Sequence, residues 1–281
     1  MEYRSTLKTT TVYIAAVLLG LVLVTPFAWL FIMSISSPAD LSAMPLHWLP
    51  QSFDFSRYVT LLTVAQNSAG AAFLASLRNS LEVVGMAVIG ALLVGVPAAW
   101  SVSRHRQVGW SIYIAIGTYM LPAVALSVPL YKGLQALGLL NNVFGLAAVY
   151  LTILAPFTTW LLKSGFDGVP REIESAAMID GARLDQILLR LTLPLAAPAV
   201  ATAALFALMV GWDEFFYALL FTSDNRAQTL PVEVAQLAGG RMTDYGLIAA
   251  AGILAALPPV IVGLALQRAL VAGLTQGAVK G

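Results

Sequence analysis

Long apolar runs without a charged residue alternate with short polar stretches along the whole chain. Six such runs reach at least about 20 residues, the length that an α-helix needs to cross about 30 Å of hydrocarbon. They lack the apolar–polar alternation of a membrane β-barrel. The pattern therefore predicts an all-α polytopic membrane protein. The six predicted transmembrane helices lie at about 11–34, 81–103, 109–131, 143–163, 194–221 and 246–268.

The composition supports this class and excludes several others. The 281 residues are 59% hydrophobic and 10% charged, and the mean hydropathy is +0.84, so we expect one transmembrane domain over 1–281. The absence of cysteine excludes disulfides, thiolate nucleophiles and cysteine metal sites. Nucleic acid is not an expected partner, because the net charge is only +1 and the basic residues are scattered over several loops.

The basic residues predict the orientation in the membrane. With six spans, ten of the fifteen Lys and Arg residues fall on the side that holds both termini, which places both termini in the cytoplasm. The first span follows Arg4 and Lys8 as a signal peptide would, but it is too long for one and is read as retained. The external loops are then 35–79 and 222–245, and the long cytoplasmic loop is 164–192.

The cytoplasmic loop concentrates charge in an otherwise apolar chain. Its sequence "REIESAAMIDGARLDQILLRLTLPL", residues 171–195, predicts two short helices joined by a turn. Pro170 and the acids Glu172 and Glu174 suit a first helical turn, and Gly181 suits a left-handed C-terminal cap. A helix this short is marginal in water, so we expect it to dock, either on the membrane surface or in a groove of a cytoplasmic partner.

Several motifs resemble one family. "ESAAMIDGA" (Glu174 to Ala182), followed by Leu191, Leu193 and Pro194, resembles the coupling-loop signature of ATP-binding cassette (ABC) importer permeases. The carbohydrate-uptake branch, which contains the maltose-type permeases, is further matched by "GWDEFFYALLFT", "TLPV", "LGLLNN" and the carboxyl-terminal "QRALVAGLTQGAVKG". The resemblance implies the type I ABC-importer permease fold in a prokaryotic cytoplasmic (inner) membrane.

The resemblance also implies the partners. They are a homologous second permease in a heterodimer, two ABC ATPase subunits, an external substrate-binding protein, the sugar substrate and the lipid bilayer. The chain has no G-x-x-x-x-G-K-[ST] loop, so ATP and Mg are expected on the ATPase subunits, with no cofactor bound by this chain and no catalytic role for it. The resemblance implies a sugar importer, and a disaccharide such as trehalose or maltose is favoured, with a glycerophosphodiester or a polyol as the alternative.

The coupling residues follow from the same match. In the family, the cytoplasmic helix docks in a cleft of the ATPase and an acid there pairs with a basic residue. In this chain Ser175 stands where the family usually has Glu, so the salt bridge is assigned to Glu174 or Glu172. The residues expected at the ATPase are Glu172, Glu174, Ser175, Ala176, Ala177, Asp180 and Gly181.

Candidates for the substrate path lie in the fifth apolar run and at the start of the second. Acids at membrane depth usually face a polar cavity, and aromatic rings can stack on sugars, although an interfacial aromatic belt with capping acids has the same composition. The path candidates are Trp212, Asp213, Glu214, Phe215 and Asn79. By position in the external loop, the candidates for contact with a binding protein are Thr229, Pro231 and Asp244.

Three other functions compete with an importer subunit. An ion-coupled secondary carrier or channel needs charged or polar groups near the midplane, yet several spans have wholly apolar cores. An intramembrane enzyme lacks its parts, because His47 and His105 are the only histidines and lie on opposite sides of the membrane in the predicted topology. A purely structural scaffold does not require the many prolines in the spans.

Overall fold

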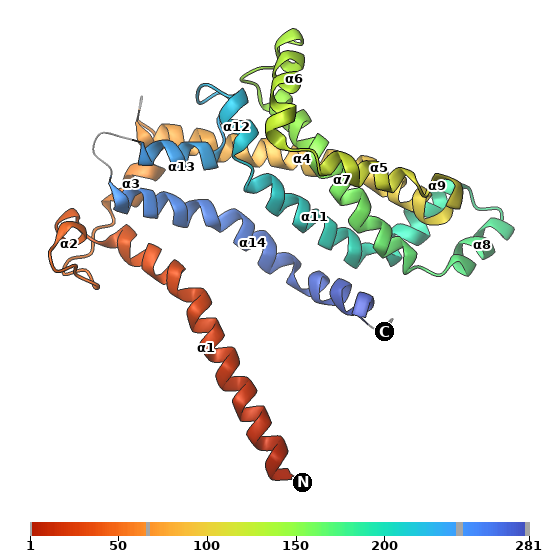
Figure 1. Cartoon of the computed structure of the whole chain (residues 1–281), viewed down its shortest axis with the longest axis horizontal. Helices are drawn as coiled ribbons and strands as arrows, with labels where there is room; N and C mark the ends of the chain where they lie inside the picture. The colour runs from red at the N-terminus through yellow and green to blue at the C-terminus, as the bar shows by residue number, and fades with distance from the viewer. Residues whose placement is uncertain (1, 66–67, 240–243, 279–281) are drawn as a thin grey trace. The chain divides into compact units, whose positions relative to one another are not determined.

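The computed structural model describes residues 2–65, 68–239 and 244–278, and within these ranges the side chains of residues 9–267 (Figure 1). The described chain is helical, apart from one isolated β-bridge between Ser36 and Phe53. The α-helices are α1 (Glu2–Ile35), α2 (Pro38–Ser42), α3 (Ser56–Leu62), α4 (Ala69–Arg104), α5 (Ser111–Tyr119), α6 (Ala123–Ala136), α7 (Val143–Asp167), α8 (Arg171–Ile179), α9 (Leu184–Gln186), α10 (Leu193–Leu195), α11 (Ala197–Trp212), α12 (Phe216–Phe221), α13 (Leu230–Ala238) and α14 (Tyr245–Ala278). A 3₁₀ turn, η1 (Arg106–Val108), precedes α5, and a π-helical segment, η2 (Ile187–Thr192), joins α9 to α10.

The all-α class predicted from the sequence is confirmed, and the contacts of the described chain form two compact units. The first unit contains the residues up to Leu74 and Glu233–Ala256. The second unit contains Ala75–Val232 and the residues from Leu257 onward. Each unit is described by itself below.

The second unit is built on α7, which packs against both α5 and α11 (Figure 1). A large core cluster surrounds Tyr150 and Leu154 of α7, both 1% exposed, and a smaller one surrounds Phe166 near its end. Helix α11 approaches α7 closely, because a Cβ at Gly165 would overlap the Ala199 side chain. The small residue therefore sets the spacing of the two helices where the cytoplasmic loop begins.

The first unit is fastened around Arg57 of α3. Its guanidinium Nε donates to Asp244 Oδ2 at 3.1 Å, and its Nη1 donates to the carbonyl oxygen of Ser36 just after α1. Asp244 also accepts from the backbone N–H groups of Gly246 and Leu247, so it caps the start of α14. Arg57 thus joins the end of α1, α3 and the start of α14.

The helices include four unbroken candidate spans, or six spans when each of two bent helix pairs counts as one. The second span is longer than its predicted range of 81–103, since α4 already begins at Ala69. The charges that ended the apolar run, Arg78 and Glu82, lie on one face of α4 as an exposed i,i+4 pair 3.2 Å apart. A helix can therefore continue through this charged stretch, and the charge-free rule placed its start too late.

The third and fifth predicted spans are broken. The third bends by 93° between α5 and α6, where Pro122 precedes the first turn of α6 and supplies no N–H. The fifth bends by 80° between α10 and α11 and is interrupted again at 213–215, between α11 and α12. The hydropathy pattern predicted each as one continuous helix, because it records apolar character and not backbone direction.

Candidate functional site

Helix α8 has the two ends that the sequence predicts. It begins at Arg171, directly after Pro170, and two acids lie in its first turn. At the other end Gly181 has a φ of +82°, its N–H donates to the Met178 carbonyl, and the Ala182 N–H donates to the Ala177 carbonyl. This is a Schellman arrangement, which satisfies the last carbonyls and stops the helix.

The first acid of the ESAAMIDGA motif points into the protein. The Glu174 side chain is 6% exposed, and its two carboxylate oxygens accept from Arg104 Nε and Nη2, both at 2.9 Å. Oε1 also accepts from Thr192 Oγ1 at 2.7 Å and from Trp100 Nε1 at 3.2 Å. We call Trp100, Arg104, Glu174 and Thr192 the Glu174 cluster.

The electrostatics of the cluster favour a charged carboxylate. Burial by itself would raise the pKa of Glu174, but the hydrogen bonds from Arg104, Thr192 and Trp100 outweigh it and hold the pKa below its usual range. The Arg104 side chain, 8% exposed, also donates to the carbonyls of Phe166 at 3.0 Å and Val169 at 3.2 Å, at the end of α7. One ion pair therefore joins the ends of α4 and α7 to α8 and η2.

The side of α8 opposite Glu174 is exposed to solvent. Glu172, Ala176 and Ile179 are spaced by four and three residues, so they share one side of the helix, and all three are exposed. Ile179 is 87% exposed. We call these three residues the outer face of α8.

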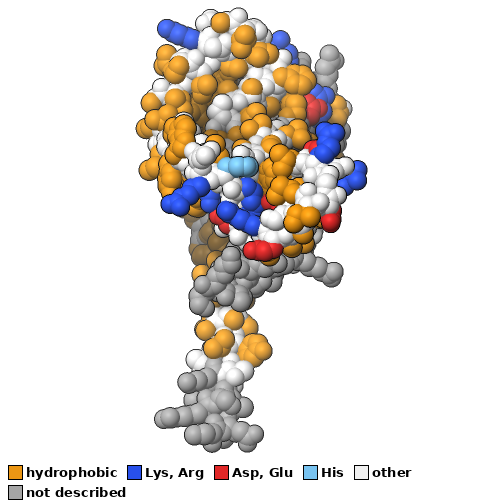
Figure 2. Space-filling model, turned by 90° about the vertical axis from the view of Figure 1, so that its right-hand side faces the viewer, with side chains coloured by type: hydrophobic (Ala, Val, Ile, Leu, Met, Phe, Trp, Pro, Cys, Tyr) orange, Lys and Arg blue, Asp and Glu red, His pale blue; other side chains and the backbone are white. Residues whose placement is uncertain are grey.

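The other predicted coupling residues lie around this outer face. Ser175 is exposed on its flank, and its hydroxyl donates to the Arg171 carbonyl within the helix. Asp180 is exposed at the C-cap, whereas Ala177 is half-buried on the side of Glu174. Figure 2 views the molecule from the end at which α8 lies, and acidic and basic side chains gather low on this face, beneath a mainly hydrophobic flank.

The segment after α8 differs from its prediction. The spacing of Leu184, Ile187, Leu188 and Leu191 predicts an α-helix, but only Leu184–Gln186 is α-helical and Ile187–Thr192 is π-helical. The π register buries Ile187 and Thr192, and Thr192 reaches Glu174. Sequence reasoning missed both Thr192 and Arg104, because no local pattern links residues 18 and 70 positions from Glu174.

The path candidates of the fifth span lie at the break between α11 and α12. Glu214 caps α12, since its carboxylate accepts from the Tyr217 N–H at 2.9 Å and the Ala218 N–H at 3.3 Å. Trp212 ends α11 and is half-buried against the larger core, and Phe215 is 38% exposed. Asp213 is the acid of this group with an exposed side chain.

The remaining candidates have structural contacts. Asn79 is fully buried, and its Nδ2 donates to the carbonyls of Asn225 at 2.9 Å and Gln228 at 3.0 Å, so it anchors the loop before α13. Thr229 is 2% exposed and Pro231 is half-buried. Asp244 pairs with Arg57, although 44% of its side chain remains exposed.

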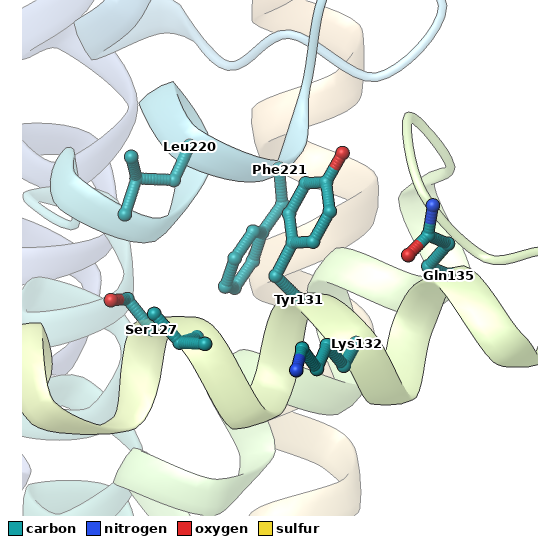
Figure 3. A pocket seen from close by; sticks show the side chains of 7 residues that line it. Ser127, Tyr131, Lys132, Gln135, Leu220 and Phe221 are labelled. Atoms are coloured by element: carbon teal, nitrogen blue, oxygen red, sulfur yellow. The ribbon is translucent and has the colours of Figure 1, made fainter.

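A pocket that sequence reasoning missed lies between α6 and α12 (Figure 3). Its volume is about 320 Å³, and the rings of Tyr131 and Phe221 meet beside it with centroids 6.3 Å apart. Ser127, Tyr131 and Gln135 recur every four residues on one face of α6, which is the signal that was available. The full lining is Ser127, Val128, Tyr131, Lys132, Gln135, Leu220 and Phe221.

Comparison with known proteins identifies the family. The family model described as "binding-protein-dependent transport system inner membrane component" matches residues 91–276. The trehalose/maltose transport system permease protein MalG of Thermococcus litoralis is 32% identical over 279 residues, which cover 98% of each chain. The trehalose transport system permease protein SugB of Mycobacterium tuberculosis is 32% identical over 260 residues, which cover 91% of this chain and 92% of SugB.

A solved structure agrees with this result. A chain of a bacterial ABC transporter that imports the acidic polysaccharide alginate superposes with a TM-score of 0.74 and 26% identity, over 92% of this chain and 96% of that one. A chain of the alginate transporter in complex with a pentasaccharide-bound periplasmic protein has a TM-score of 0.66 at 17% identity and supports the fold alone. The chain thus belongs to the inner membrane components of binding-protein-dependent transport systems, as a multi-pass, non-catalytic ABC importer permease.

Proposed function

We propose that the chain is the membrane subunit of an ATP-driven importer that carries a sugar into the cytoplasm by alternating access. The observation that carries the proposal is that α8 has one side bound within the chain and one side exposed. Glu174 fixes one side within the chain, while Ile179 on the other is 87% exposed. An exposed aliphatic side chain on a short charged helix is typical of a docking surface.

The docking partner in this proposal is an ABC ATPase subunit. The outer face presents one acid, one small residue and one large aliphatic residue in two turns of helix, which suits a shallow cleft with a basic group at its rim. Glu172 is therefore the acid that we assign to the ATPase, in place of Glu174, with Ser175 and Asp180 beside it. ATP and Mg would then be held by two ATPase subunits and not by this chain.

A second, homologous permease completes the membrane part of the proposed complex. Helix α1 has an 18-residue window of mean hydropathy 2.4, none of which is buried within the chain. Such a helix needs an apolar environment on all sides, which lipid and a second permease together would provide.

Sugar is the substrate class supported by the relatives. The names of MalG and SugB specify trehalose or maltose, and the sulfoquinovosyl glycerol permease SmoH of Agrobacterium fabrum is 33% identical over 91% of this chain. We favour a disaccharide such as trehalose or maltose, and keep a polyol or a glycerophosphodiester as the alternative. At an identity near 32% a family's substrate class carries over more safely than one sugar.

The sugar path in this proposal uses the helix break in the fifth span and the pocket between α6 and α12. Asp213 is the exposed acid at the break, and the pocket adds an aromatic face with hydroxyl, amide and ammonium groups. This combination is suited to sugar hydroxyls and ring faces. Glu214 and Asn79 hold the backbone beside the path in this proposal and do not contact the sugar, because each already binds backbone groups.

An external binding protein would deliver the sugar in the proposed complex. Of the contact candidates, Thr229 is buried, Pro231 is half-buried and Asp244 is half-exposed beside Arg57. Exposed positions are available on α13 at Ala235 and Gln236. We therefore assign the contact surface to these exposed positions together with the open edge of Asp244.

The test of this function is reconstitution. The chain is placed in proteoliposomes with its second permease, the ATPase and the binding protein, and uptake is measured with trehalose, maltose, a polyol and a glycerophosphodiester. We expect one loaded binding protein to stimulate both uptake and ATP hydrolysis. ATP turnover that responds to none of the loaded binding proteins contradicts an importer.

The docking of α8 has a test at one position. Gly181→Val places a β-branched residue at a φ of +82° and strains the turn, whereas Gly181→Asn is the control, because Asn tolerates this conformation. Nothing lies within 4 Å of a Cβ there, so the two variants differ in backbone strain and not in crowding. We expect the Val variant to retain less ATPase on copurification, and equal retention by both contradicts docking through α8.

A further inference from the structure

The Glu174 cluster joins α8 by side-chain hydrogen bonds to the end of α4 and to the π-helical segment η2. We propose that Glu174 and Arg104 are positioning residues that transmit the motion of α8 to α4 and α11, and that Glu174 is not a ligand of the ATPase. The inference rests on the proposed function, since it requires a partner that moves α8. It goes further by assigning the transmission to a named buried ion pair.

Glu174 is buried and its carboxylate is already paired within the chain, which disfavours an external partner. Its oxygens accept four hydrogen bonds between 2.7 and 3.2 Å, from Arg104, Thr192 and Trp100. A carboxylate that bound a partner's basic residue would have to give up some of these bonds and leave Arg104 buried without its counter-charge. Glu172, two residues earlier, is exposed and free of this constraint.

Arg104 spreads the connection over several elements. Besides Glu174, its guanidinium binds the carbonyl oxygens of Phe166 and Val169, which lie at and after the end of α7. Arg171 adds a parallel link, since its Nη2 donates to the Ser103 carbonyl of α4 at 2.7 Å. The planar guanidinium can hold a carboxylate and two carbonyls in one plane of donors, which a lysine ammonium cannot reproduce.

Thr192 connects the cluster to the start of α11. It is the last residue of the π-helical segment and is fully buried, and its hydroxyl makes the shortest bond to Glu174. The chain bends by 80° between this segment and α11. A π segment beside a bend is a place where a helix can change register at low cost, so a pull on Glu174 is passed to α11 through Thr192.

The experiment compares three conservative variants of the cluster with a variant of Glu172, the acid on the same helix that the proposed function assigns to the ATPase. Glu174→Gln, Arg104→Lys and Thr192→Val each keep the approximate size of the side chain and weaken the cluster, while Glu172→Gln changes the exposed acid. Each variant is reconstituted in the full complex. Retained ATPase, ATP hydrolysis, sugar uptake and the thermal unfolding midpoint are measured on the same preparations.

The expected result is uncoupling by the cluster variants. Glu174→Gln and Arg104→Lys should keep the ATPase bound and hydrolysing, but raise the ATP consumed per sugar by roughly tenfold, within the range seen for changes along a coupling path. Thr192→Val should act in the same direction by a smaller factor. The combination of Glu174→Gln with Arg104→Lys should be no worse than the stronger single variant, because both act on one link.

Two outcomes overturn the inference. Loss of the ATPase from Glu174→Gln, with full retention by Glu172→Gln, makes Glu174 the ATPase ligand. An unchanged ratio of ATP to sugar in both Glu174→Gln and Arg104→Lys shows that the pair only stabilises the fold. A failure of the proposed function is distinguished by oxidative cross-linking of Ile179→Cys to a cysteine introduced in the ATPase cleft, with an added thiol oxidant. Absence of any cross-link in the otherwise unchanged complex contradicts the docking itself.

Discussion

Each of the two units contains a buried arginine that pairs with an acid, and the two pairs differ in how far the acid is buried. Arg104 in the second unit and Arg57 in the first each bind one carboxylate and carbonyl oxygens in the last turn of a long helix or just after it. The carbonyls are those of Phe166 and Val169 for Arg104, and those of Ser34 and Ser36 for Arg57. Both arrangements satisfy groups that a helix end leaves without an intrahelical partner.

The two pairs differ in the burial and the hydrogen bonds of the acid. Glu174 is 6% exposed and accepts from three side chains, whereas Asp244 is 44% exposed and divides its oxygens between Arg57 and the first turn of α14. Arg57 Nη2 is buried with no hydrogen-bond partner among the described residues. The arginine–carboxylate pair is thus buried at Arg104 and partly exposed to solvent at Arg57. The buried pair is therefore better suited to hold its helices in place.

The largest expected effect comes from removing each arginine. Arg104→Ala leaves a buried carboxylate without a counter-charge and should lower the free energy of unfolding by about 3–5 kcal/mol. Arg57→Ala leaves a carboxylate that water can reach, and should cost about 1–3 kcal/mol. Thermal unfolding in detergent measures both.

The control for this pair is Arg226→Ala. Arg226 forms an exposed pair with Asp224, and the two side chains are 76% and 48% exposed, so its loss should cost less than about 1 kcal/mol. Equal losses for Arg104→Ala and Arg57→Ala would show that burial of the acid does not decide the strength of the two pairs.

A smaller effect is expected from crowding Arg57. A Cβ at Gly246 would overlap the guanidinium of Arg57, so Gly246→Ala should displace the side chain and cost about 1–3 kcal/mol. Gly252→Ala, also in α14, meets nothing within 4 Å and should be neutral or stabilising by up to about 1 kcal/mol. A Gly246→Ala variant as stable as Gly252→Ala would mean that Arg57 is not held where the structure places it.

The two pairs also mark what could be predicted from the sequence. The ends of α8 were predictable, because Pro170 and Gly181 act on their own backbone and need no distant partner. The direction of Glu174 was not, since Arg104 lies 70 residues away and pairs with it only after α4 and α7 have packed. The hydrogen bond of Asn79, a candidate for the path, to the Gln228 carbonyl was likewise not predictable, because the two residues are 149 positions apart.

The breaks in the apolar runs were only partly predictable from the sequence. Pro122 supplied a visible signal for the bend between α5 and α6, and a hydropathy pattern alone gave it no weight. The π register of Ile187–Thr192 has no comparable signal, because its residues are as compatible with an α-helix. Features that depend on local residues, such as the helix ends, could therefore be predicted from the sequence. Helix register and side-chain pairing depend on the packed structure.

The smallest expected effect is a pH dependence of stability that distinguishes the Glu174–Arg104 pair from the neutral Glu174→Gln variant. Because the pKa of Glu174 is lowered in the folded state, its charge contributes stability above the unfolded pKa, and the contribution is lost as the pH falls through the folded pKa. The difference in unfolding midpoint between the natural chain and Glu174→Gln should therefore be widest near neutral pH. It should narrow below the ordinary Glu pKa of about 4.3. A difference for Glu174→Gln that does not change between neutral and acidic pH would mean that the buried carboxylate is not held in its charged form by Arg104, Thr192 and Trp100.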